Sequence, residues 1–162
     1  MLLPHYRRLL AYEIEANKRI LAAIDTIPAA ARQGPAYTRL TQLLPHNQLA
    51  RQVWLWRINV TPYDNPKDWF PSQTTDQTRA QCEKMDGAWS TYLAGLTEGD
   101  LAREVRYSSS EGQKYISTVA DILTHVFNHS TYHRGQAARL ITECGGQRPT
   151  TDFIAITRKA AE

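Results

Sequence analysis

The chain has 162 residues, of which 42% are hydrophobic and 22% charged, and its formal net charge is +3. This length and composition are typical of one globular domain with a buried core, so we expect a single domain over residues 1–162. Positive charges are scattered along the chain, which argues against the dense Lys/Arg surface of a nucleic-acid-binding protein. The sequence has no signal-peptide pattern and no membrane-spanning apolar run, so we expect a cytoplasmic protein without a membrane partner.

Four stretches have the apolar spacing of 3.6 residues that is typical of amphipathic helices. The first begins at Pro4 and stops before Pro28, and the second covers about 37–59. Pro45 lies within the second stretch and predicts either a kink or a late start of that helix. The third helix is expected to begin at about Thr75 and to end at a polar cluster, residues 97–100.

The fourth helix is expected over about 117–144, because Gly145 and Gly146 supply a stop signal. Residues 60–74 hold three prolines without periodicity and predict a long loop. Two short β-prone runs flank the polar residues 108–112, which predicts a small hairpin within 101–118. With a short C-terminal helix over 153–159, the pattern predicts an all-α four-helix bundle.

The two cysteines, Cys82 and Cys144, do not have the spacing of a metal-binding pair. We expect them to be buried or free thiols of a reducing compartment, and a disulfide between them is the less favoured alternative.

Three of the five histidines lie in the fourth helix at intervals of four residues, namely His125, His129 and His133. Side chains four residues apart lie on the same helix face, and two imidazoles in this arrangement are a common way to chelate a divalent ion. We place His129 and His133 on the inward face of the helix. The alternative is a pair of core histidines, but each would then need partners for both ring nitrogens.

One ion cannot bind all three of these histidines. His125 and His133 are about 12 Å apart along the helix axis, because each residue rises about 1.5 Å. His129 therefore pairs with either His125 or His133. We prefer His133, which leaves His125 to line the pocket or, equally well, to contact water on the helix surface.

A third ligand must come from another helix, and His46 is the best candidate. Leu43, Ala50 and Val53 lie three residues before it and four and seven residues after it, so His46 lies on an apolar helix face. Alone, it would more often be a core or loop histidine. His5, near the chain start, is interpreted as a surface residue.

The segment His125-Val126-Phe127-Asn128-His129-Ser130-Thr131-Tyr132-His133-Arg134-Gly135-Gln136 resembles the HxxNHxxxHRGQ motif of the DinB family. This family belongs to the DinB/YfiT-like group of predicted metalloenzymes. Weaker similarities extend over nearly the whole chain, including His46 with Trp54-Leu55-Trp56-Arg57 and, downstream, Thr151-Asp152-Phe153-Ile154.

The resemblance implies a three-histidine metal site formed by His46, His129 and His133, holding Zn²⁺, Ni²⁺ or a similar ion. It also implies up-up-down-down connectivity and, often, a homodimer. Many relatives have a Glu one turn after the histidine of the second helix, where this chain has Ala50. That difference counts against a mechanism that needs a carboxylate base at this place.

Three neighbours of the histidines are candidates for the pocket. Arg134 can hold an anionic group of a substrate, although an ion pair on the helix face is the simpler interpretation. Asn128 and Tyr132 can hydrogen-bond to the ligand rings or pack between helices. In the long loop, Trp69 can cover the pocket or lie on the surface.

Two functions are compatible with these residues. The first is a metal-dependent enzyme, a thiol-dependent S-transferase or a hydrolase, whose ion keeps an open position for water and whose small-molecule substrate includes a thiol. The second is a non-catalytic, stress-related protein that binds a metal or a small molecule. A fourth protein ligand closing the site would favour the second function.

Overall fold

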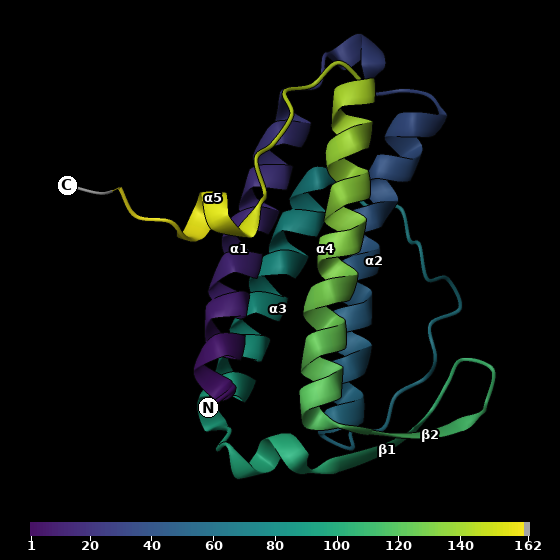
Figure 1. Ribbon diagram of the computed structural model, residues 1–162. Helices are drawn as coiled ribbons and strands as arrows, with labels where there is room; N and C mark the ends of the chain where they lie inside the picture. Colours follow the sequence, from purple (N-terminus) through teal and green to yellow (C-terminus); the bar gives the residue numbers. More distant parts are fainter. Residues whose placement is uncertain (161–162) are drawn as a thin grey trace.

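The computed structural model describes residues 1–160, so the last two residues of the expected domain lie outside the described part. Four long helices form the body of the molecule (Figure 1). They are α1 (Leu3–Asp25), α2 (Pro35–Ile58), α3 (Thr75–Gly95) and α4 (Val119–Glu143). Short 3-10 helices lie at Ala29–Ala31 (η1) and Gly99–Ala102 (η2), and α5 (Phe153–Thr157) packs beside α1. The expected helical bundle is therefore confirmed.

The ends of the helices follow local sequence signals. Thr74 and Thr118 cap α3 and α4, and each forms a capping box with the third residue of its helix. Gly145 ends α4 with φ of 77°, the left-handed conformation that glycine adopts without a steric cost. α5 ends at Thr157, two residues earlier than expected.

Pro45 does not delay the start of α2, which begins at Pro35 and continues through Pro45. Residues 43–48 are all buried, although a helix normally exposes one side. The loop between α2 and α3 explains this burial, because Trp69 and Phe70 of that loop lie against His46. The predicted long loop thus covers the outer face of α2, as Figure 1 shows.

The connectivity is up-down-down-up, which corrects the expected up-up-down-down order. α1 and α3 are antiparallel, since Arg7 donates to the carbonyl of Leu93 and Arg79 pairs with Asp25. α2 and α3 are parallel, and the chain returns between them along the outside of the bundle (Figure 1). Their loop makes this possible, because about 16 extended residues span roughly 50 Å and α2 is about 36 Å long.

The predicted hairpin is confirmed and lies at the end of the bundle where α2 ends and α4 begins (Figure 1). Its strands β1 (Glu104–Ser108) and β2 (Lys114–Thr118) are antiparallel, with Tyr107 opposite Tyr115. The hairpin and the loop before α3 thus stand on the same side of α2.

The interior has two apolar clusters, one near each end of the bundle. Polar side chains from all four helices lie between them, three of them buried and that of Asp86 partly exposed. Glu13 pairs with Arg134, and both are 1% exposed; Arg51 pairs with Asp86 at 2.9 Å. We call these four residues the polar layer.

Both cysteines are free and buried, as expected. No helix within residues 1–160 is long and apolar enough to cross a membrane.

Candidate metal centre

His46 of α2 and His129 and His133 of α4 meet on one side of the bundle. One ring nitrogen from each lies within 4.8 Å of the others. His46 and His133 are buried, with 7% and 8% exposure, and His129 is partly exposed. The antiparallel packing of α2 on α4 brings these residues together, although His46 and His129 are separated by 83 positions.

Two hydrogen bonds orient the rings. His46 donates from Nδ1 to the carbonyl oxygen of Trp69 at 2.7 Å, and His133 donates from Nδ1 to Oε1 of Gln136 at 3.1 Å. An oxygen of this kind can only accept, so Nδ1 carries the proton and Nε2 keeps a free lone pair. This is the tautomer in which Nε2 binds a metal.

The donor set fits a divalent cation. The Nε2 atoms of His46 and His129 are 3.2 Å apart. Two nitrogens bound to one tetrahedral ion at about 2.0–2.1 Å would be about 3.4 Å apart, which is nearly the same separation. Because His46 carries its proton on Nδ1, its Nε2 accepts a hydrogen bond from Nε2 of His129, and a bound cation would take the place of that proton.

The surroundings keep the rings neutral, as metal ligands must be. Burial, together with the neighbouring His133, His46 and His125, lowers the pKa of His129 to about 3. Burial also lowers the pKa of His46 and of His133, and Arg39 contributes to both shifts. No carboxylate contributes to these shifts within the described residues.

The inward face of α4 differs from the sequence expectation at one position. Ser130 is fully buried at the centre of the face, whereas His129 lies at its edge. The buried positions follow the 3.6-residue period through 126, 130, 133 and 137, so His129 lies beside this buried stripe. His129 is consequently accessible from a cavity.

That cavity has a volume of about 420 Å³, and His46 and His129 form part of its wall. His125 lines it as well, with its ring 5.5 Å from the ring of His129. His125 is not part of the three-histidine group. The hairpin contributes Tyr107 and Tyr115 to the wall.

The other candidate residues lie elsewhere. Arg134 is buried in the polar layer with Glu13, so it is neither on the helix surface nor in the cavity. Tyr132 is 65% exposed and touches the site only through its ring, 5.0 Å from that of His133. Asn128 is exposed and does not line the cavity.

Sequence reasoning overlooked four contributors. The backbone carbonyl of Trp69 and the ring of Phe70, stacked 4.1 Å from that of His46, come from the loop. Gln136 was noted only as the last residue of the family motif, although a residue three positions after His133 is within its hydrogen-bonding reach. Arg57 was noted only as part of the family resemblance, yet it lines the cavity.

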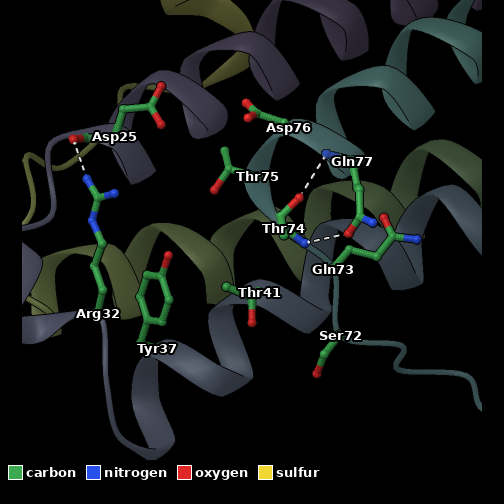
Figure 2. A pocket seen from close by; sticks show the side chains of 10 residues that line it. All are labelled: Asp25, Arg32, Tyr37, Thr41, Ser72, Gln73, Thr74, Thr75, Asp76 and Gln77. Carbon is green, nitrogen blue, oxygen red and sulfur yellow. Dashed lines mark hydrogen bonds between the residues drawn. The ribbon is translucent and has the colours of Figure 1, made fainter.

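A second cavity, of about 670 Å³, lies between the end of α1 and the starts of α2 and α3. In Figure 2 Arg32 donates to the backbone of Asp25, and Thr74 and Gln77 exchange two hydrogen bonds. The cap at Thr74 thus satisfies donors of the first turn of α3. This cavity has no histidine or cysteine in its wall.

Known proteins resemble this chain in sequence and in fold. The sequence model of the DinB family matches residues 1–162. The chain belongs to the DinB family. This DinB-family chain is 22% identical over 155 residues to "Protein DinB" of Bacillus subtilis strain 168, with 90% of each covered. It resembles the crystal structure of a DinB-like protein from Bacillus cereus ATCC 10987, with a TM-score of 0.66 and 19% identity. That match covers 90% of this chain and 94% of the other, and it supports the fold.

Proposed function

We propose that this DinB-family protein binds a divalent cation, Zn²⁺ or Ni²⁺, through His46, His129 and His133 and is a metal-dependent enzyme. Imidazole nitrogens suit both ions. The reaction class that fits best is transfer of a thiol to an electrophile, and hydrolysis is the second candidate.

One observation carries the proposal: three neutral imidazoles meet beside an open cavity, and hydrogen bonds orient two of them. No Asp, Glu or Cys joins the three histidines within residues 1–160. A structural metal site is usually closed by four protein ligands, whereas a catalytic site keeps a position open. The cavity beside His46 and His129 gives a small molecule access to that position.

A divalent cation held here would act as a Lewis acid that lowers the pKa of a bound water or thiol. The chain's own residues prepare the site. Trp69 and Gln136 hold two rings in the binding tautomer, and Phe70 shields His46 from water. Thiol transfer is favoured over hydrolysis because Ala50 occupies the place of a carboxylate base.

Metal analysis of protein purified without a histidine tag tests the site. His129→Ala and His133→Ala are each expected to abolish stoichiometric metal binding, because two imidazoles bind far more weakly than three. The matched control is His5→Ala, which changes an exposed histidine away from the site. Equal metal content in the three variants would show that the ligands are assigned wrongly.

Conjugation of an electrophile with a low-molecular-weight thiol is then measured with and without metal. Metal-dependent turnover supports an enzyme, and binding without turnover favours a non-catalytic metal-binding protein. The homodimer that the family resemblance implies remains a prediction, and light scattering of the metal-loaded protein tests it.

A further inference from the structure

The cavity beside the three histidines contains one positively charged side chain. Its wall is largely aromatic, with Trp54, Trp69, Tyr107 and Tyr115 among its residues. Among its lining residues within 1–160, Arg57 is the only Lys or Arg, and there is no Asp or Glu. The cavity thus combines apolar walls with a single cation, which is the composition of a binding site for an organic molecule.

Arg57 is held in one position by its neighbours. Its Nε donates to the hydroxyl of Tyr63 at 2.7 Å, and NH2 donates to the carbonyl oxygen of Ser108 at 3.0 Å. The guanidinium lies 4.7 Å from the ring centre of Trp54 and 5.0 Å from that of Tyr107. The long loop, the hairpin and α2 therefore all contribute to its position.

The charge of Arg57 has no acidic partner. The two buried arginines of the polar layer each pair with a carboxylate, but no ion pair within residues 1–160 includes Arg57. A guanidinium has five N–H donors, and its two hydrogen bonds leave three of them free. A partly buried, fixed cation with free donors is well suited to bind an anion.

Two rings connect Arg57 with the three histidines along the cavity wall. The ring of Trp54, next to the guanidinium, is 5.3 Å from that of His125, and His125 is 5.5 Å from His129. A molecule that reaches from the histidines to Arg57 along this wall therefore passes these two rings. This favours a substrate with a flat or apolar middle part.

From this arrangement we infer that Arg57 anchors the anionic end of the substrate, a monocarboxylate whose apolar body lies along Trp54 and His125. This inference rests on the proposed function, because the opposite end of the same molecule reaches the metal centre. Arg57 is a binding residue and does not touch the reacting atoms.

A carboxylate fits better than a phosphate monoester. Two parallel N–H donors of a guanidinium match the two oxygens of a carboxylate. A phosphate monoester carries close to two negative charges at neutral pH, and the single cation of this cavity would leave one of them uncompensated.

The test uses the full chain loaded with Co²⁺ and two probes of nearly the same shape, 4-mercaptobenzoate and 4-mercaptobenzamide. Each probe is titrated while the thiolate-to-cobalt absorption is recorded. The unchanged protein is expected to bind the carboxylate roughly 10- to 100-fold more tightly than the amide, as a charge-assisted hydrogen bond implies. Arg57→Gln is expected to bring this ratio close to one without changing the cobalt content.

Arg57→Lys keeps the charge but loses the two-pronged donor, so an intermediate ratio is expected. The matched control is Arg106→Gln, since Arg106 lies on the hairpin that Arg57 contacts, is 74% exposed in its side chain and pairs with Glu104. This variant is expected to keep the full preference for the carboxylate.

A ratio near one in the unchanged protein, or a ratio that Arg57→Gln does not alter, overturns the inference. Absence of cobalt binding, or of an absorption change with either probe, contradicts the proposed function instead. In that case the metal-free protein is titrated with 3-phenylpropionate and with 3-phenylpropanamide, and tryptophan fluorescence gives its affinity for each. This comparison tests the role of Arg57 independently of the metal. Equal affinity for these two probes likewise overturns the inference.

Discussion

At the scale of single residues, the histidines of this protein are distinguished by the hydrogen bond that each ring makes. His46 and His133 each donate from Nδ1 to an oxygen, and this leaves Nε2 free to bind an ion. His125, on the same helix face, contacts Trp54 and lines the cavity. Equal spacing in the sequence therefore does not mean equal chemistry.

Val60 is a residue of another kind, whose backbone conformation is strained. It has φ of 54° just after α2, which is unfavourable for a β-branched side chain. Val60 donates from its N–H to the carbonyl of Arg57, and Thr61 donates to that of Trp56, so Val60 occupies the position where helices usually have glycine.

We predict that Val60→Gly stabilises the protein by about 1 kcal/mol, because relief of strain exceeds the added freedom of the unfolded chain. Urea unfolding followed by circular dichroism measures the change. Val60 is 82% exposed, so the loss of side-chain contacts is small. The stability of Val60→Ala, which removes only the β-branch, is expected to lie between that of the unchanged protein and that of Val60→Gly. A glycine variant less stable than the unchanged protein would contradict this prediction.

At the scale of helices, α4 contributes to the candidate metal centre and to the polar layer through two neighbouring sets of residues. His129 and His133 belong to the metal centre, whereas Ser130 and Arg134 face the interior. The polar layer is thus directly adjacent to the metal centre. An ion pair between α1 and α4 at this level holds the helix that carries two of the three ligands.

We predict that Glu13→Gln lowers the free energy of unfolding by about 3–5 kcal/mol, because it leaves the charge of Arg134 buried without compensation. Denaturant unfolding at neutral pH checks this value. The control is Glu143→Gln, which removes the exposed pair with Arg139 and should cost less than about 1 kcal/mol. Similar losses in both variants would mean that the polar layer does not retain a buried charge pair.

At the scale of the whole molecule, the candidate metal centre joins parts of the chain that are far apart in sequence. His46 belongs to α2, its ring is oriented by the loop before α3, and the remaining ligands belong to α4. An ion bound here would link α2 to α4 in the folded state and would find no comparable site in the unfolded chain.

We predict that Zn²⁺ at 1,000 times its Kd stabilises the fold by about 4 kcal/mol, since it binds the native state alone. The change is measured as a rise in Tm with and without a chelator. His46→Ala should abolish this rise, even though the two ligands on α4 remain. A similar rise in this variant would indicate that zinc binds elsewhere.

The amino-acid sequence alone determined the four helices, the hairpin and the pairing of His129 with His133. These features are local, because helix geometry places residues 129 and 133 on one face and because Thr74, Thr118 and Gly145 end or begin helices through their immediate neighbours. The choice of His46 depended on its apolar helix face and on the resemblance to the DinB family.

Only the tertiary structure decided which groups surround the site. The carbonyl of Trp69 reaches His46 from 23 residues away, and Arg134 turns to Glu13 across 121 residues. The up-down-down-up order was also decided only by the tertiary structure. The loop before α3 is long enough either to return along the bundle or to stay at the same end, so its length does not determine the direction of α3. Such contacts depend on how segments that are distant in the sequence pack together. No local pattern of residues therefore predicts them.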